Sequence, residues 1–224
     1  LHYAKSMLSS WMARDERETN PEMFGSSKAY VLAQPKGVIG NMLPWNFPFD
    51  IGLGPLAEML AGGNSVIIKP SDMTPACGAL MKEILKAAIS EDIVAVANGD
   101  VELAKAFPTL DWDHLMYTGN PDVARLVATA AAQNLTPLTL ELGGKSPAVI
   151  CPSASIGKAV KAIAQGKFVN AGQTCIAPDY VLAPRGKTEE VGQAVFTHAL
   201  RAYPDLGADY STMISERAFD RMID

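Results

Sequence analysis

Short apolar runs rich in β-branched residues alternate with helix-like segments along much of the chain. Four of the runs predict buried strands, because they lack the alternating polar residues of a half-exposed sheet: KGVIGNML, NSVIIKP, DIVAVAN and HLMYTG. This alternation constrains the fold strongly, since successive strand–helix–strand units form a parallel sheet with helices on both faces. The sequence therefore predicts an α/β protein with a doubly wound parallel sheet.

Two of the helix-like segments open with clear start signals. Thr74 is the predicted N-cap of the segment TPACGALMKEILKAAIS, with Pro75 as its first helical residue, and Asn120 and Pro121 repeat this pattern. Helical spacing then predicts which apolar side chains face inward. They are Leu80, Met81, Ile84, Leu85 and Ala88 in the first segment, and Val123, Leu126, Val127 and Ala130 in the second.

The arrangement is Rossmann-like and suits a nucleotide, because strand ends and the helix N-termini after them gather backbone N–H groups that bind phosphate. The usual GxGxxG fingerprint is absent. Paired glycines in ELGGKSP, residues 141–147, predict a junction between two domains. Both ends look cut, since Leu1 is not a methionine and a helix predicted to begin at Ser215 reaches Asp224 without a stop signal.

Composition narrows the class of protein. The 224 residues are 48% hydrophobic and 19% charged, which indicates a soluble globular protein with a substantial core. A net charge of -5 argues against a nucleic-acid partner. The apolar runs are too short to span a membrane and no leader opens the chain, so a cytoplasmic location is expected. Three scattered cysteines and three scattered histidines predict neither a disulfide framework nor a metal site.

Cys175, in the stretch NAGQTCIAPD, is either a nucleophile or a small apolar residue. Gly172 is the predicted left-handed cap of the preceding helix, which would place Cys175 on a turn. Cys77 falls in the first turn of a predicted helix and Cys151 at a strand end. Both are interpreted as structural, because nothing nearby in the sequence would activate a thiolate.

A cysteine nucleophile needs a base and a group that stabilises the developing oxyanion. Glu141 lies between two leucines, where burial would raise its pKa towards that of a general base, or it is simply an acidic residue at a strand end. Asn46, in PWNFPF, is either a hydrogen-bond donor to an oxyanion or a turn residue. The local sequence leaves both choices open.

Five segments taken together resemble the aldehyde dehydrogenase superfamily in order and approximate spacing: PWNFPF, VIIKPSD, YTGNPDVA, LTLELGGKSP and KFVNAGQTCIAPDY. The last two are most similar to the class 3 and coniferyl aldehyde dehydrogenase branch. The resemblance implies NAD(P)-dependent oxidation of an aldehyde, such as aromatic coniferyl aldehyde, to a carboxylate by a homodimer. It also implies that residues 1–140 belong to an NAD(P)-binding domain and that 141–224 begin a catalytic domain, both domains being incomplete.

The same resemblance assigns roles to individual residues. Cys175 matches the nucleophile that forms a thiohemiacetal and then a thioester, Glu141 the general base for thioester hydrolysis, and Asn46 the oxyanion donor. The positions that match NAD or NADP contacts are Trp45, Lys69, Asp72, Gly99, Gly119 and Asn120.

The sequence departs from the family pattern in three respects. Ala124 stands where the family often has glycine, and Asp72 where many members have glutamate, which leaves the choice between NAD and NADP open. The family's later glutamate and phenylalanine, which contact the nicotinamide and its ribose, have no counterpart before Asp224. Two alternatives to an active dehydrogenase follow: an inactive fragment that only binds nucleotide, and a cysteine hydrolase that needs no cofactor.

Overall fold

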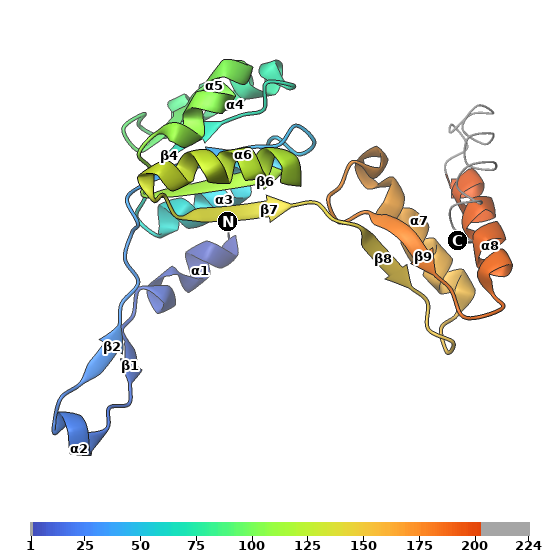
Figure 1. The fold of residues 1–224 in the computed structure, drawn as a ribbon, viewed down its shortest axis with the longest axis horizontal. Helices are drawn as coiled ribbons and strands as arrows, with labels where there is room; N and C mark the ends of the chain where they lie inside the picture. Colours follow the sequence, from blue (N-terminus) through green and yellow to red (C-terminus); the bar gives the residue numbers. More distant parts are fainter. Residues whose placement is uncertain (1, 203–224) are drawn as a thin grey trace. The chain divides into compact units, whose positions relative to one another are not determined.

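The computed structural model describes residues 2–202, and the chain divides into two compact units between Leu142 and Gly143. The helix predicted at Ser215 lies outside the described residues. The elements of the first unit are α1 (His2–Trp11), β1 (Asp15–Arg17), α2 (Pro21–Phe24), β2 (Ala29–Val31), β3 (Val38–Met42), α3 (Asp50–Ala61), β4 (Ser65–Lys69), α4 (Pro75–Ala88), β5 (Val94–Val96), α5 (Val101–Ala106), η1 (Phe107–Thr109), β6 (His114–Gly119), α6 (Pro121–Ala131), η2 (Ala132–Asn134) and β7 (Leu138–Leu142) (Figure 1). Those of the second are β8 (Ser146–Val149), α7 (Ile156–Phe168), η3 (Val169–Gly172), β9 (Pro178–Leu182) and α8 (Thr188–Ala202).

The first unit contains a five-stranded parallel sheet in the order β5-β4-β3-β6-β7. The chain runs outward from β3 through β4 to β5, then returns to the other side of β3 with β6 and β7. Met42 on β3 therefore pairs with Lys69 on one side and with Tyr117 on the other. This order confirms the predicted doubly wound sheet and places its topological switch point between β3 and β6.

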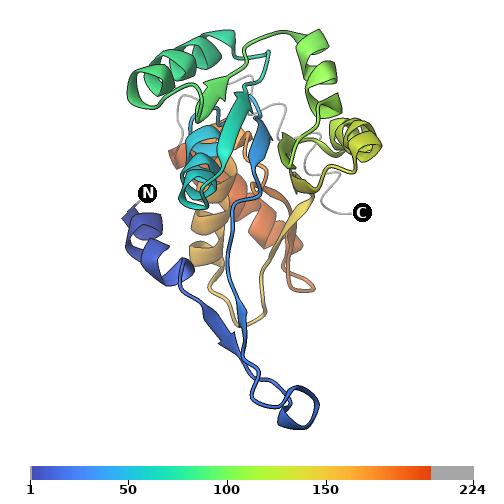
Figure 2. The ribbon, with the colours of Figure 1, turned by 90° about the vertical axis from the view of Figure 1, so that its left-hand side faces the viewer.

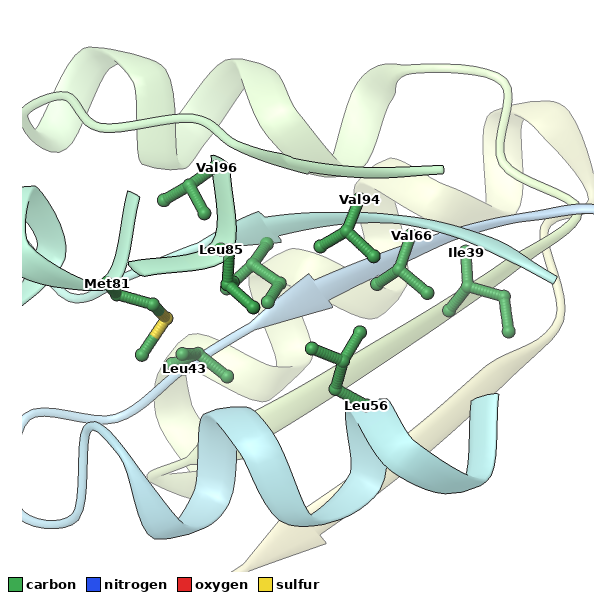
Figure 3. Packing of buried hydrophobic residues seen from close by; sticks show 9 residues of the cluster. Ile39, Leu43, Leu56, Val66, Met81, Leu85, Val94 and Val96 are labelled. Carbon is green, nitrogen blue, oxygen red and sulfur yellow. The ribbon is translucent and has the colours of Figure 1, made fainter. Parts of the chain in front are cut away.

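Apolar side chains pack on both faces of this sheet. Figure 3 shows the cluster on one face, where Ile39 and Val66 point from the strands towards Leu56 of α3, and Met81 and Leu85 enter from α4. The cluster on the other face comprises Met42, Phe107, Trp112, Leu115, Tyr117, Ala124, Val127 and Ala131. The two clusters fix the strands from both sides and so hold the strand ends in place.

The predicted helix starts are right, because α4 begins at Pro75 and α6 at Pro121. The Asn120 side chain accepts a hydrogen bond from the backbone N–H of Val123 at 2.8 Å, as an N-cap does. Thr74 occupies the N-cap position of α4, but its side chain makes no capping hydrogen bond.

The predicted inward faces of these two helices are partly wrong. Met81, Leu85 and Val127 are buried as expected. The exceptions are Leu80, Ile84, Ala88, Val123 and Leu126, which are exposed, and Ala130, which is half-buried. Small residues face the sheet in their place, namely Gly78 on α4 and Ala124 and Ala131 on α6. At Gly78 an added Cβ would lie 3.1 Å from Cβ of Pro70, so close packing of the backbone decides which face turns inward.

An antiparallel hairpin precedes the sheet. Asp15 on β1 pairs with Val31 on β2, and α2 lies at the closed end of the hairpin (Figure 2).

The second unit contains a two-stranded parallel ladder, in which Ala148 of β8 pairs with Val181 of β9. Helix α7 connects the two strands, and α8 packs against α7. Their buried side chains include Val160 on α7 and Val191 on α8. In residues 2–202 there is no helix that combines the length and the apolar character required to cross a membrane.

Candidate active site

Five candidate residues of the first unit lie at one edge of the parallel sheet. Lys69 and Gly119 end β4 and β6, Glu141 is the penultimate residue of β7, and Asn46 and Gly99 follow β3 and β5. In an open parallel sheet, ligands bind outside the carboxyl ends of the strands, at the switch point. Asn46 follows β3 and Gly119 ends β6, so these two residues flank that point.

Asn46 lies in the bend that connects β3 to α3. The bend begins where the N–H of Leu43 donates to the carbonyl of Lys69 at 3.0 Å, which continues the parallel ladder beyond β3. It ends where α3 begins at Asp50. Asn46 is half-buried, whereas the neighbouring Trp45 is 43% exposed. Regular structure at both ends thus positions the bend that carries the amide.

Lys69 is buried, with only 3% of its surface exposed. Its Nζ donates a hydrogen bond to the carbonyl of Pro70 at 3.0 Å and lies 3.9 Å from the carboxylate of Asp72. Burial lowers the pKa of Lys69, and the negative charges of Asp72 and Asp100 partly oppose that effect. An ammonium group has three donors, so Lys69 retains donors for a hydroxyl-bearing ligand at the strand end.

Asp100 was missed in the sequence analysis. It is the N-cap of α5, where its Oδ1 accepts hydrogen bonds from the N–H groups of Glu102 at 3.0 Å and Leu103 at 3.3 Å. The available signal was an aspartate directly before a helical segment, a few residues beyond a predicted strand. Gly99 precedes it, and an added Cβ there would lie 2.6 Å from Cδ2 of Leu103, so a larger residue would displace that side chain.

The turn from β6 into α6 is tightly packed. A Cβ at Gly119 would lie 2.2 Å from the hydroxyl of Tyr117, so the backbone here approaches its neighbour more closely than a larger residue allows. Asn120 then caps α6, so the N-terminus of this helix begins at the carboxyl end of β6, a position that suits an anion such as phosphate. Ala124 is 2% exposed and lies within the second apolar cluster, so the methyl group at this departure from the family pattern is accommodated.

Glu141 is exposed, which contradicts the expected burial between leucines. Alternate residues of a strand point to opposite faces, so Leu140 and Leu142 do not cover the carboxylate. Moreover, β7 is the outermost strand of the sheet in the described residues. Glu141 therefore presents its carboxylate to solvent near the end of β7, adjacent to Thr118 on β6, and its role as a general base stays a prediction.

Cys175 is exposed and lies in a turn between η3 and β9. The N–H of Ala177 donates to the carbonyl of Thr174 at 3.0 Å, so Cys175 is one of the two central residues of this turn. Three successive left-handed residues precede it: Asn170 (φ 50°), Ala171 (φ 55°) and Gly172 (φ 77°). The left-handed conformation predicted for Gly172 is confirmed. Asn170 and Ala171 adopt it at a cost of about 1–2 kcal/mol per residue, since their Cβ atoms crowd the following carbonyl.

The three cysteines differ in their surroundings. Cys77 is half-buried in the first turn of α4, Cys151 is exposed beyond β8, and all three are free thiols. Because Cys175 is exposed, it does not act as a small apolar residue packed among the described side chains. Within residues 2–202 there is no group of three or more side chains suited to hold a metal ion. The arrangement offers an accessible thiol, a strand-end carboxylate and a sheet edge suited to a nucleotide.

Sequence comparisons identify the family of the chain. Residues 3–224 match the aldehyde dehydrogenase family. A probable coniferyl aldehyde dehydrogenase of Pseudomonas aeruginosa is 44% identical over 224 residues, an alignment that covers 99% of this chain and 47% of that protein. A coniferyl aldehyde dehydrogenase of a Pseudomonas species is 38% identical over 221 residues, with 98% and 45% covered. The chain thus spans about half the length of the curated relatives it matches.

Solved structures agree as well. The substrate-bound AldH of Staphylococcus aureus matches with a TM-score of 0.85 at 33% identity, covering 90% of this chain and 44% of that one. An aldehyde dehydrogenase of Mycobacterium tuberculosis, in complex with NAD+, matches with a TM-score of 0.78 at 30% identity, covering 90% and 41%. These matches confirm the α/β fold read from the strand–helix alternation.

Proposed function

The chain belongs to the aldehyde dehydrogenase family, and from that premise we propose that the full-length protein oxidises an aldehyde to a carboxylate with NAD or NADP. One observation carries the proposal. Lys69, Gly119 and Asn120 gather at the carboxyl edge of a doubly wound sheet, in a chain that also presents an exposed thiol on a turn, that of Cys175. We assign the first unit to cofactor binding and the start of the catalytic domain to the second.

The residues at the sheet edge fit a dinucleotide. The Lys69 ammonium, buried but with donors remaining, suits ribose hydroxyls, and Asp72 lies beside it. The N-terminus of α6, at Gly119 and Asn120, suits a pyrophosphate. Gly99 allows close approach on the adenine side, and Trp45 walls the cofactor cleft. When bound there, NAD or NADP supplies the two-electron oxidant of the reaction.

The remaining candidate residues perform the covalent steps. The Cys175 thiolate attacks the carbonyl carbon of the aldehyde and forms a thiohemiacetal, while the Asn46 amide and the Cys175 N–H donate hydrogen bonds to its oxyanion. When this adduct loses a hydride, which bound NAD or NADP would accept, a thioester remains on Cys175. Glu141 then takes a proton from the water that attacks the thioester, the C–S bond breaks, and the carboxylate product leaves with the thiolate restored.

The proposed substrate is an aromatic aldehyde such as coniferyl aldehyde, because two of the similar proteins carry that name. Either cofactor is compatible with Asp72, whose carboxylate is one methylene shorter than glutamate and so repels a 2′-phosphate less effectively. The homodimer and the cytoplasmic location stay predictions.

The test is an absorbance assay of reduced nicotinamide with the full-length protein, NAD or NADP, and coniferyl aldehyde beside an aliphatic aldehyde. We expect turnover that requires both cofactor and aldehyde, with the aromatic aldehyde preferred. Hydrolysis of activated esters without cofactor, and no aldehyde oxidation, would instead identify a cysteine hydrolase. Cofactor binding without any turnover would identify a nucleotide-binding protein.

A further inference from the structure

Lys69 and two carboxylates lie at the carboxyl ends of neighbouring strands. Strand β5 lies next to β4 in the sheet, and the N–H of Ala97 donates to the carbonyl of Ile68 at 2.8 Å, which continues the ladder beyond β5. Lys69 follows Ile68 at the end of β4, and Asp100 follows Ala97 by three residues. The chain leaves β4 through Asp72, whose Oδ1 lies 3.9 Å from Nζ of Lys69. The three charged side chains therefore belong to one part of the sheet edge.

The charges of both carboxylates act on the lysine. Burial lowers the pKa of Lys69, and the negative charges of Asp72 and Asp100 oppose that effect, so both carboxylates lie within electrostatic range of the ammonium. Asp72 and Asp100 are exposed, whereas Lys69 is buried. A ligand that reaches this edge from solvent therefore meets the two carboxylates as well as the lysine.

The carboxylate of Asp100 is held in place by backbone groups of α5. Its Oδ1 accepts hydrogen bonds from the N–H groups of Glu102 at 3.0 Å and Leu103 at 3.3 Å. Both hydrogen bonds use Oδ1, which leaves Oδ2 of the fixed carboxylate as an acceptor for a ligand. The next two charges on α5 offset each other, because Glu102 pairs with Lys105 at 2.7 Å. Asp100 thus adds a fixed negative charge to this part of the edge.

We propose that Asp100 is a specificity-determining residue of the ribose site and that, together with Asp72, it makes this site prefer NAD to NADP. The inference rests on the proposed function, in which Lys69 binds the adenosine ribose. NADP differs from NAD by a 2′-phosphate. Such a phosphate group carries a charge of about −1.5 to −2 at neutral pH.

The sign of the local charge decides which ribose is favoured. Lys69 alone would attract a 2′-phosphate, and Asp72 offsets that single positive charge. Asp100 adds a second negative charge, so the three groups together repel the phosphate. A ribose without the phosphate is uncharged, and its hydroxyls donate hydrogen bonds that carboxylates accept. Asp72 alone leaves the choice of cofactor open because it is shorter than glutamate, and Asp100 compensates for that difference.

The test measures the binding of NAD and of NADP to the full-length protein by calorimetric titration, without aldehyde. Asp100→Asn removes the charge and keeps the N-cap, because asparagine caps a helix about as well as aspartate does. We expect the unmodified protein to bind NAD more tightly than NADP. The variant should bind NADP about fivefold more tightly than the unmodified protein does, with little change for NAD. Salt at about 0.5 M should narrow this difference, because it screens charges at an exposed edge.

Glu91→Gln is the matched control. It removes one carboxylate near the amino end of β5, where Glu91 pairs with Lys86 at 3.3 Å, so the affinity for NADP should not change. Urea titration of Asp100→Asn should give an unchanged free energy of unfolding, which separates loss of the charge from loss of structure. Unchanged NADP affinity in Asp100→Asn, equal changes for both cofactors, or tighter binding of NADP by the unmodified protein would overturn the proposal.

Failure of this proposal can be told apart from failure of the proposed function. A protein that binds nucleotide and oxidises no aldehyde would refute the dehydrogenase, while the titrations would still decide between NAD and NADP. A protein that oxidises aldehyde with no shift in Asp100→Asn would retain the dehydrogenase and refute the role of Asp100. Binding of neither cofactor would overturn both.

Discussion

The two units hold their candidate residues by different means. In the first unit, Lys69 is buried and hydrogen-bonded and Asn120 caps a helix, so side-chain contacts and packing fix both positions. In the second unit, Cys175 is exposed on a turn that follows three left-handed residues, so backbone conformation fixes its position. The difference suggests a division of roles, in which the packed sheet supports cofactor affinity and the strained turn sets the reactivity of the thiol.

Removal of the thiol is expected to have the largest effect. Cys175→Ala lowers kcat for aldehyde oxidation by at least about 10³-fold, because no covalent adduct can form. Steady-state kinetics measure this loss of kcat. A titration measures the cofactor affinity of the same variant, which the division of roles predicts to be unchanged. Cys151→Ala is the matched control, since that thiol is also exposed in the second unit. A large loss in the control, or none in Cys175→Ala, would assign the nucleophile elsewhere.

Glu141→Gln tests whether a residue of the first unit acts in catalysis rather than in cofactor binding. We expect kcat to fall by about 10²–10⁴-fold, because the amide cannot accept a proton from the hydrolytic water. Stopped-flow absorbance distinguishes the step: a rapid burst of reduced cofactor survives while the later turnover slows. Glu102→Gln is the control, an exposed carboxylate of the same unit paired with Lys105. Loss of the burst itself would show that Glu141 acts before the thioester forms.

Lys69→Met tests the role that we assign to the packed first unit, namely cofactor affinity. Removing the ammonium weakens cofactor binding about tenfold, which raises the KM for NAD or NADP, while kcat changes little. Lys105→Met provides the comparison, because that lysine is exposed at the surface of the same unit. If Lys69→Met lowers kcat and leaves KM unchanged, the assignment of Lys69 to the ribose is wrong.

A pair of glycines tests the strained turn. Gly172→Ala and Gly186→Ala each place a Cβ on a left-handed residue of the second unit, with φ +77° and φ +78°. Both should lower the free energy of unfolding by about 1–2 kcal/mol, measured by urea titration. Only Gly172→Ala should also lower kcat/KM, several-fold, because its Cβ would approach the carbonyl of Lys167 at 3.1 Å and shift the turn. Equal activity of the two variants would refute control of the thiol by backbone conformation.

The smallest effect is a pH dependence of stability in the first unit. Burial, with help from the charge of Lys36, lowers the pKa of His114 from its ordinary value of 6.5. The unfolded chain then binds more protons than the folded one as pH falls below 6.5, so stability decreases on acidification until the lowered pKa is passed. Urea titrations between pH 5 and 7.5 should show this component, and His114→Gln should remove it. A stability difference between the two proteins that is constant with pH would contradict the shift.

The strand–helix alternation could be predicted because it depends on residues that are close together in the sequence. The buried faces of the helices were predicted less well, because they depend on packing between residues that are far apart in the sequence. Asn120 and Pro121 predict a helix start because capping involves only neighbours in sequence. Leu80 and Leu126 were wrongly placed inward, since Gly78 and Ala124 allow the helix backbones to approach the sheet and turn the larger side chains outward.

The same limit applies to the candidate site. A turn at Cys175 could be predicted from Gly172, but the exposure of Glu141 depends on β7 being the outermost described strand of the sheet. The closeness of Asp100 to Lys69 likewise depends on the pairing of β5 with β4, two strands that α4 separates in the chain. Such pairings are fixed by the sheet register, which single residues do not reveal.

The central claim is that Cys175 carries the acyl group of the oxidised aldehyde. Peptide mass spectrometry of the full-length Glu141→Gln variant, mixed with aldehyde and oxidised cofactor and then digested, tests it most directly. The account predicts an added acyl group on the peptide that contains Cys175, formed only when the oxidised cofactor is present. An unmodified Cys175, or an acyl group on Cys77 or Cys151 instead, would contradict it.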